Sequence, residues 1–462
     1  ILSSGLIDKK LNLKAVDYYL SFGYIPAPES IYEYIFKLPP AHSMILKDGK
    51  LTLEKYWELD YANKINIDEH EAEQEIIRLL KDAIKVRLYS DVPLGVFLSG
   101  GVDSSTIVAL MSELSSSRIK TFSIGFQERD YSELNYARKI AERYDTEHNE
   151  FIVKPNALEV LPLLVERYGE PYADSSCIPT YYVSREARRY VTVALNGDGG
   201  DESFAGYLRY QGMLARDIFS KIPHPLRALL SAAANSFPGS LDTNRFLIKA
   251  KKFIRAYSMD DIGCYASWIS IFTEDMKNNI YSEDYKKIIS GNNVNHWLGS
   301  FMGQPNSVGI LDRVLNTDVQ TYLPYDLLVK ADIASMANSL EARSPFLDHR
   351  LMEFAARLPA EYKMKRFTKK YILKKAIKSL LPKQNIHRKK MGFGVPVGRW
   401  FKAELRELLY DTLLSSSSLK RGYFDFRVVK KMLGSHIAGK QDYSFQLWSL
   451  LMLELWHKKF ID

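Results

Sequence analysis

The chain has 462 residues, 46% of them hydrophobic and 26% charged, and its formal net charge is +8. This is too long for one ordinary domain and typical of a folded protein with a large core. The sequence has no apolar run near the roughly 18 residues of a membrane span and no signal-peptide pattern. Its two cysteines, Cys177 and Cys264, lie far apart, which argues against a disulfide framework or a cysteine zinc site. We therefore expect a cytoplasmic protein without membrane contact.

Residues 1–62 differ in pattern from the rest of the chain. Within 42–60, two extended runs flank Asp48-Gly49, a dipeptide that favours a tight hairpin turn. Residues 13–22 form a helix-like stretch. These features predict the end of a β-rich unit with a linker, followed by a larger domain over residues 63–462.

From residue 67 the pattern becomes that of an α/β domain. A helical stretch comes first, with apolar residues at helical spacing. Short β-like runs then alternate with helices, at 94–100, 119–126, 148–153 and 190–197. This alternation predicts a mostly parallel sheet flanked by helices. Beyond about residue 205 the chain is expected to be mainly helical.

The sequence VFLSGGVDSSTIVAL, residues 96–110, combines a buried strand, two glycines and the start of a helix. Glycines let the backbone approach a ligand, and the free N–H groups of a helix start favour an anion. Asp103 would repel a bare phosphate, so it suggests a divalent cation between the two. The stretch is neither a Walker phosphate loop nor a GxGxxG motif.

Four further stretches carry chemistry-bearing residues. LNGDGGDESFAGY (195–207) places three acidic residues among glycines after a strand, and TFSIGF (121–126) closes another strand with a glycine. Residues 336–359 contain LEARSPFLD, and 387–401 place Lys389 and Lys390 before a glycine-rich turn. Taken singly, an acidic turn or a lysine-rich turn is ordinary surface.

Together these motifs resemble the synthetase domain of the glutamine-hydrolysing asparagine synthetase family. SGGxDSS, FSIG, LxGxGxDE, LEARxPFLD and RKKxGF occur in the family's order over roughly residues 65–460. The resemblance implies an adenine-nucleotide-hydrolase-like α/β fold of the PP-loop type, with ATP and Mg²⁺ as cofactors. It also implies that a carboxylate, most favourably the β-carboxylate of aspartate, is adenylated with release of pyrophosphate. Ammonia then displaces AMP to give the amide, which is asparagine for this acceptor.

The resemblance also implies roles for individual residues. The residues expected around pyrophosphate are Ser99, Gly100, Gly101, Asp103, Ser104 and Ser105. Those expected to frame adenosine are Phe97, Ile124, Asn196 and Gly197. Magnesium would be held by Asp103 and Asp201. The catalytic centre would be completed by Asp198, Tyr207 and Lys390.

The sequence departs from the family pattern in two respects. The family's glutaminase domain begins with a nucleophilic cysteine, whereas this chain begins with Ile1 and residues 1–62 resemble only the end of that domain. We therefore expect free ammonia, or ammonia from a separate glutaminase domain or subunit, as the nitrogen source. The acceptor site is also altered, because Asp198 replaces the usual Glu and Ile333 replaces a frequent basic residue. No basic residue in 170–188 could be placed for the α-carboxylate of aspartate.

These departures leave other functions open. A β-lactam synthetase-like cyclase, or an amidotransferase acting on a surface-glycan sugar acid, would keep adenylation and change the acceptor. An RNA-modifying pyrophosphatase would need catalytic cysteines and a nucleic-acid module, neither of which is visible, so nucleic acid is not an expected partner. The presence of Asp103, Asp201 and Lys390 argues against a non-catalytic nucleotide sensor. A homodimer is left open.

Overall fold

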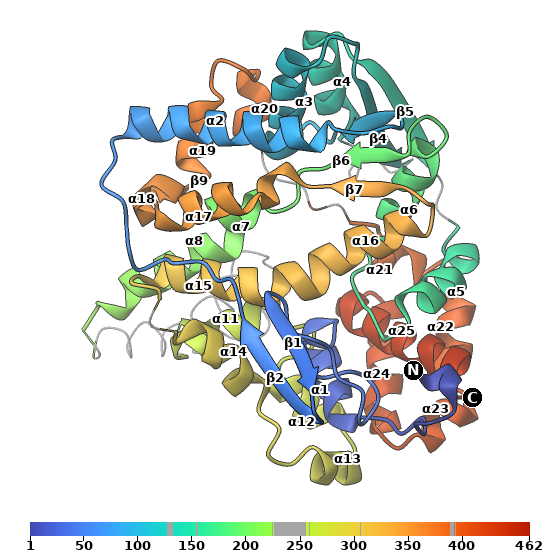
Figure 1. The fold of residues 1–462 in the computed structure, drawn as a ribbon. Helices are drawn as coiled ribbons and strands as arrows, with labels where there is room; N and C mark the ends of the chain where they lie inside the picture. The colour runs from blue at the N-terminus through green and yellow to red at the C-terminus, as the bar shows by residue number, and fades with distance from the viewer. Residues whose placement is uncertain are drawn as a thin grey trace.

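A five-stranded parallel sheet lies in the upper part of the molecule in the view of Figure 1. The computed structural model describes residues 1–462 apart from 127–132, 154–155, 224, 226–255, 258, 305, 389–391 and 393. The strands are β3 (Leu94–Phe97), β4 (Lys120–Phe126), β5 (Glu147–Val153), β6 (Val193–Leu195) and β7 (Glu341–Arg343). Their spatial order is β5-β4-β3-β6-β7, and every neighbouring pair is parallel.

The expected α/β fold class is confirmed, and the four predicted runs correspond to β3, β4, β5 and β6. The sequence analysis missed β7. This strand has three residues, two of them charged, and it joins the edge of the sheet by parallel pairing with β6, from Val193 with Glu341 to Leu195 with Arg343. A segment so short has no periodicity of its own, so only its tertiary position makes it a strand.

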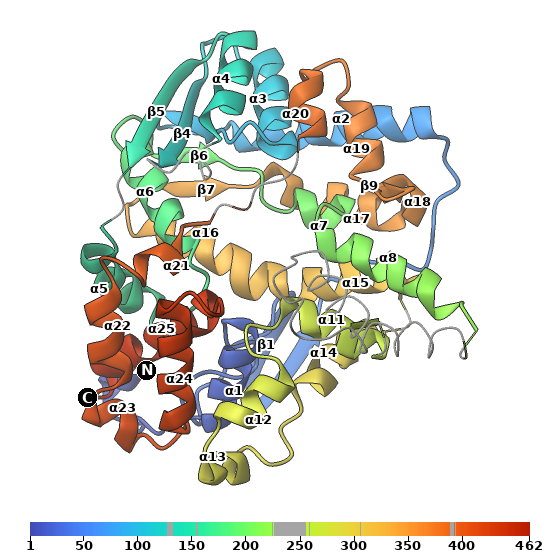
Figure 2. The ribbon, with the colours of Figure 1, turned by 180° about the vertical axis from the view of Figure 1, so that it is seen from behind.

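Helices cover both faces of the sheet. On one face lie α2 (Glu69–Arg87), α3 (Val102–Leu114) and α4 (Leu134–Arg143), and on the other α6 (Cys177–Ala187) packs against α16 (Leu328–Met336), as Figures 1 and 2 show from opposite sides. The apolar positions of α2 are four residues apart, and Ile76, Leu80 and Ile84 are completely buried. This spacing places them on the helix side that faces the core.

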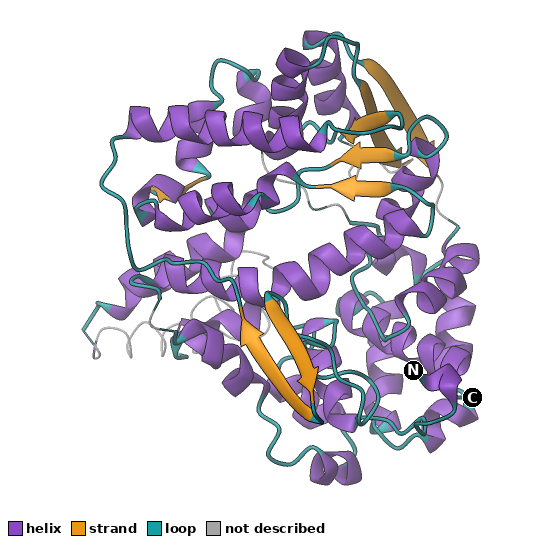
Figure 3. Cartoon of the chain, in the orientation of Figure 1, coloured by secondary structure: helices purple, strands orange, loops and turns teal. Residues whose placement is uncertain are grey.

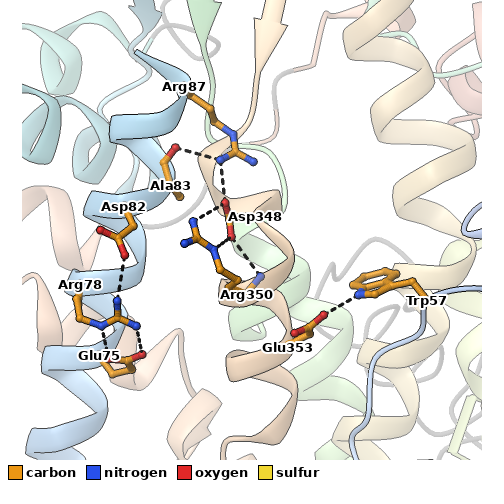
Figure 4. Close-up of polar contacts among 9 residues, drawn as sticks. All are labelled: Trp57, Glu75, Arg78, Asp82, Ala83, Arg87, Asp348, Arg350 and Glu353. Carbon is orange, nitrogen blue, oxygen red and sulfur yellow. Dashed lines mark hydrogen bonds and ion pairs between the residues drawn. The ribbon is translucent and has the colours of Figure 1, made fainter. Parts of the chain in front are cut away.

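The motif LEARSPFLD holds α2 to the rest of the domain. Asp348 caps α17 (His349–Arg357) by accepting a hydrogen bond from the backbone N–H of Arg350, and it forms ion pairs with Arg350 and Arg87 (Figure 4). Burial alone would raise the pKa of Asp348, but the hydrogen bonds from the two arginines lower it to about 2. Arg343 donates to the backbone carbonyls of Arg87 and Tyr89 at 2.8 Å each. Arg343 and Asp348 therefore fix the C-terminal end of α2 to this motif.

The N-terminal segment consists of a helix and an exposed hairpin. The predicted hairpin is present, with β1 (His42–Lys47) antiparallel to β2 (Lys50–Lys55) and positive φ angles at Asp48 and Gly49. Helix α1 (Leu13–Phe22) lies instead in the core against the C-terminal helix α25 (Ser444–Phe460), and the hydroxyl of Tyr19 donates to the carbonyl of Ser449 at 2.7 Å. The domain boundary at residues 62 and 63 stays a prediction.

The second half of the described chain is mainly helical, as expected (Figure 3). The remaining helices are α5 (Ala157–Tyr168), α7 (Gly200–Phe204), α8 (Leu208–Ser220), α11 (Asp261–Ile269), α12 (Glu274–Ile280), α13 (Glu283–Ile288), α14 (Val294–Met302), α15 (Ile310–Gln320), α18 (Ala360–Lys363), α19 (Tyr371–Ala376), α20 (Lys383–His387), α21 (Val397–Trp400), α22 (Arg406–Leu413), α23 (Ser416–Lys420) and α24 (Phe426–Ile437). Shorter elements are η1 (Leu2–Ser4), η4 (Leu323–Leu327), η5 (Pro345–Leu347), β8 (Met364–Lys365) and β9 (Thr368–Lys369). Among the helices of the described residues, none has the length and apolarity that crossing a membrane requires.

Candidate active site

A cavity of about 510 Å³ lies at the carboxyl ends of the central strands. Its lining includes Phe97 at the end of β3, Ile124 in β4, and Asn196 directly after β6. The chain leaves β3 toward β4 on one side and reaches β6 on the other, so the strand order reverses here. Such a reversal at the carboxyl edge of a parallel sheet is the usual ligand site of open α/β folds.

The SGGVDSS loop forms one wall of this cavity. Gly100 has a φ of 71°, and a Cβ there would lie 2.4 Å from the carbonyl carbon of Tyr136, so the position requires glycine. Helix α3 then begins after Gly101, whose N–H donates to the Ser99 hydroxyl at 3.2 Å. The start of an α-helix with glycine and small hydroxyl side chains suits an anionic ligand.

Most of the residues predicted for the nucleotide are brought together here. Those that line the cavity are Phe97, Ser99, Gly101, Asp103, Ser104, Ile124, Asn196 and Gly197. Gly100 and Ser105 do not line it. Gly100 packs against the start of α4, and Ser105 is completely buried with its hydroxyl unpartnered in the described structure. Gly100 and Ser105 therefore contribute to the shape of the loop and do not line the cavity.

The two carboxylates expected to hold magnesium meet at one point. Asp103 comes from the first turn of α3 and Asp201 from α7, and the Nζ of Lys370 lies 2.6 Å from Oδ1 of Asp103 and 2.8 Å from Oδ1 of Asp201. Burial would lower the pKa of Lys370, but the two carboxylates raise it, so it is a cation. Close packing enforces the arrangement, because a Cβ at Gly206 would lie 1.8 Å from Oδ1 of Asp201.

The donor set fits Mg²⁺ that is shared with phosphate. Magnesium is usually held by one or two carboxylates together with substrate phosphates and water. Asp103 and Asp201 meet that requirement, since a single cation already lies within reach of both. In the part of the chain that the structure describes, no group of three or more His, Cys, Asp or Glu side chains could hold a metal ion by itself.

Lys370 was missed by the sequence analysis. It lies in the run Lys369, Lys370, Lys374 and Lys375, which has the appearance of a solvated helix face. The structure buries Lys370 almost completely, at the start of α19. Its unusual backbone conformation, with φ of 53°, directs this one lysine of the run toward the acidic pair. Local sequence contains no signal for this.

A second group of residues also lines the cavity, and we call it the far end to distinguish it from the SGG loop: Asp174, Ser176, Asp198, Tyr207, Tyr322 and Lys330. The Tyr207 hydroxyl donates to Oε1 of Glu202 at 2.5 Å, and burial raises the pKa of Tyr207 well above its ordinary value. Tyr207 is therefore a neutral phenol. Lys330 donates to Oδ2 of Asp174 at 3.0 Å, and this lysine was also missed by the sequence analysis.

The predicted catalytic lysine, Lys390, lies outside the described residues. Its described neighbours Arg388, Gly392 and Gly394 line the cavity. Arg388 forms an ion pair with Glu133 and stacks over the Tyr136 ring at 4.8 Å. The role of Lys390 stays a prediction.

Comparison with known proteins agrees with the family resemblance of the sequence motifs. The family model for asparagine synthase matches residues 75–458. The chain is 32% identical over 458 residues to asparagine synthetase [glutamine-hydrolyzing] 1 of Bacillus subtilis, covering 97% of this chain and 69% of that protein. It is 25% identical to asparagine synthetase [glutamine-hydrolyzing] 3 of the same organism, over 78% of this chain and 54% of the relative. It is also 24% identical to amidase chyE of Penicillium rubens, over 86% of this chain and 64% of the relative.

Proposed function

Because the chain belongs to the asparagine synthase family, we propose that it adenylates the β-carboxylate of aspartate with ATP and converts the product to asparagine with ammonia. The family and its relatives identify the chain as an ATP-dependent carbon–nitrogen ligase. The acceptor and the nitrogen source are the proposed part. The observation that carries the proposal is the meeting of Asp103 and Asp201 beside the SGG loop, in one cavity that also has an acidic and basic far end.

The first half-reaction takes place at the loop end. A carboxylate oxygen of the acceptor attacks the α-phosphorus of ATP, and the bond from that phosphorus to the bridging oxygen of the β-phosphate breaks. Pyrophosphate leaves with the negative charge that develops. The N-terminal N–H groups of α3 would face that charge, and Mg²⁺ held by Asp103 and Asp201 would neutralise part of it. Lys370 keeps the two carboxylates together before ATP binds.

The second half-reaction takes place at the far end. Ammonia attacks the acyl carbon, the bond from that carbon to the AMP oxygen breaks, and a proton must leave the nitrogen. Asp198 lines this region and is the carboxylate that we propose to accept the proton. Tyr207, a neutral phenol donating to Glu202, shapes the same wall.

Two features support ammonia rather than glutamine as the substrate of this chain. Both cysteines are buried and burial raises the pKa of each thiol, to about 12 for Cys264, so neither is an activated nucleophile. The hairpin β1–β2 exposes apolar side chains, Leu46 at 69% and Leu51 at 53% among them. Such a surface suits contact with a glutaminase domain or subunit that supplies ammonia.

The test is product analysis. The chain is incubated with ATP, Mg²⁺, ammonium and a set of carboxylates, and the nucleotides and amides are identified by mass spectrometry. We expect AMP, pyrophosphate and asparagine with aspartate, and no amide with glutamine as the only nitrogen source. Formation of ADP and phosphate would overturn adenylation. An amide or cyclic product with a sugar acid or an amino-acid derivative, and none with aspartate, would overturn the acceptor.

A further inference from the structure

A largely buried arginine lies behind two tyrosines of the cavity wall. Arg209 is in the first turn of α8, two residues after Tyr207, and its side chain is 16% exposed. Tyr207 and Tyr322 line the cavity, and Arg209 is not among the lining residues. Its guanidinium lies over both rings, with the central carbon 4.1 Å from the centre of the Tyr207 ring and 4.5 Å from that of Tyr322. The arginine therefore contacts the wall of the site from behind.

A cation at this position is costly unless a partner compensates it. The first turn of a helix is the positive end of the helix dipole, and burial removes water from the charge. Asp318 of α15 is the compensating partner, because its Oδ2 accepts hydrogen bonds from Nε at 3.0 Å and from Nη2 at 2.6 Å. Burial would lower the pKa of Arg209, but Asp318 raises it above its ordinary value, so the guanidinium is charged.

The carboxylate of Asp318 is itself fixed from several sides. It is completely buried, its Oδ2 also accepts a hydrogen bond from the hydroxyl of Tyr210, and its Oδ1 accepts one from the hydroxyl of Tyr265. These donors come from α8 and α11, so three helices meet at one carboxylate. The guanidinium that this carboxylate holds has little freedom to move. The rings of Tyr207 and Tyr322 therefore pack on a rigid support before any substrate binds.

The hydroxyl of Tyr207 is the group on which this support acts. It donates to Oε1 of Glu202 in α7 at 2.5 Å. Burial raises the pKa of Tyr207, and the charge of Arg209 opposes the rise. A cation over the face of the ring is attracted to its electrons and favours negative charge on the phenol oxygen, so it makes the hydroxyl a stronger donor. The flat guanidinium suits this place better than an ammonium, because it stacks on rings and forms paired hydrogen bonds.

We propose that Arg209 is a positioning residue, which fixes the ring of Tyr207 and strengthens the hydrogen bond from its hydroxyl to Glu202. The proposal rests on the proposed function, in which Tyr207 shapes the wall where the second half-reaction takes place. It adds a residue that touches neither ATP nor the acceptor. Because Arg209 lies behind the wall, its loss changes the rate of the bound reactants and leaves the binding of ATP almost unchanged.

The experiment is steady-state amide synthesis with ATP, Mg²⁺, ammonium and the carboxylate that the product screen identifies. Arg209→Met should lower kcat about 10- to 100-fold and change the KM for ATP less than about 3-fold. Arg209→Lys keeps the charge beside Asp318 without the flat contact, and it should recover part of the loss. If Arg209→Met leaves Asp318 too costly to bury, Arg209→Met combined with Asp318→Asn removes both charges. Arg427→Met, at an exposed arginine paired with Asp425 at 2.7 Å, is the matched control and should keep the wild-type kcat.

A double-mutant cycle separates positioning from general support of the fold. Tyr207→Phe removes the hydroxyl that Arg209 is proposed to position. In the Tyr207→Phe chain, Arg209→Met should therefore lower kcat by no more than about 2-fold. The same loss in both backgrounds would refute the proposal, because a merely structural arginine would act independently of the hydroxyl. An unchanged kcat in a folded Arg209→Met chain would refute it as well.

A measurement without substrate separates this proposal from the proposed function. Failure of the wild-type chain to form asparagine would refute the proposed function, whereas ¹⁹F NMR of 3-fluorotyrosine at position 207 tests the support of the ring in either case. We expect one sharp resonance in the wild-type background and a broadened or split one with Arg209→Met, because an unsupported ring occupies more than one position. The Arg427→Met control should leave the resonance sharp. A resonance that Arg209→Met leaves unchanged would refute the role of Arg209.

Discussion

The two ends of the cavity are built in different ways. The phosphate end comes from continuous stretches of chain, in which a strand runs into a glycine loop and a helix start, as in residues 96–110. The acceptor end is assembled from single side chains on separate elements, such as Asp174 before α6 and Lys330 on α16. The first end therefore offers the backbone N–H groups of a helix start, and the second offers side-chain charges. The backbone of the SGG loop can therefore be predicted from local sequence, whereas the charged side chains that meet beside it, and those at the second end, cannot.

The sharpest test of the phosphate end is removal of either acidic ligand. Asp103→Asn and Asp201→Asn should each lower magnesium-dependent turnover about 1000-fold, because the charge that balances the cation is lost. Circular dichroism should show an unchanged fold. Asp145→Asn, at an exposed carboxylate paired with Arg118, is the control and should keep full activity. Near-normal turnover in both variants would mean that ATP alone holds the magnesium.

The second test concerns the lysine pair that precedes Gly392. Lys390→Ala should lower kcat about 100- to 1000-fold and change the apparent affinity for ATP much less, because a cation at the leaving pyrophosphate acts mainly in the transition state. Lys389→Ala should be mild. Steady-state kinetics of both variants decide the matter. If Lys389→Ala is the inactive variant and Lys390→Ala is mild, the catalytic lysine is Lys389. If both variants are active, neither lysine stabilises the leaving pyrophosphate.

The third test asks whether close packing keeps the acidic pair in place. Gly206→Ala should lower stability by about 1–3 kcal/mol and turnover about 10- to 100-fold, since the new Cβ would displace Asp201 and Lys370. Gly434→Ala, at a helical position with open space around it, should be neutral or slightly stabilising. Chemical denaturation and turnover measure both effects. Equal behaviour of the two variants would contradict the packing argument.

The smallest effect belongs to the acceptor end and concerns pH. Burial, with Asp174 nearby, raises the pKa of Asp326 to about 7, while Lys330, Tyr172 and Arg209 oppose the rise. The raised pKa contributes stability that is fully present below the unfolded pKa near 4 and is lost as pH rises through 7. Asp326→Asn should therefore gain stability relative to the wild-type chain, by the order of 1 kcal/mol, between pH 5 and pH 8.

Melting temperatures of the wild-type and Asp326→Asn chains, each measured at about pH 5 and about pH 8, test the direction of this change in stability. Taking the difference between variant and wild type removes the contribution of groups that titrate in both. A difference that is the same at both pH values would mean that Asp326 is ionised across the whole range. Asp326 would then carry a negative charge close to Lys330 at neutral pH.

The sequence alone was sufficient for the fold class and for most of the residues that line the cavity around the SGGVDSS loop. Four strands, the hairpin at Asp48-Gly49 and the SGGVDSS loop follow from local patterns, because alternation, turn preference and helix starts are encoded within a few residues. The packing of Gly100 against the start of α4 agrees with its identity as glycine. The motif LNGDGGDESFAGY, which follows β6 and contains Asp198 and Asp201, was found for the same reason.

Only the tertiary structure decided which charges meet. Lys370 is indistinguishable by local pattern from the surface lysines around it, yet it lies between Asp103 and Asp201, from which it is separated by more than 150 residues of chain. Nothing in the local sequence marks Lys330 as the partner of Asp174, and the two meet only because α16 packs beside the loop that carries Asp174. Electrostatic partnership depends on distance in space, which the packing of helices on the sheet sets and which sequence separation does not predict.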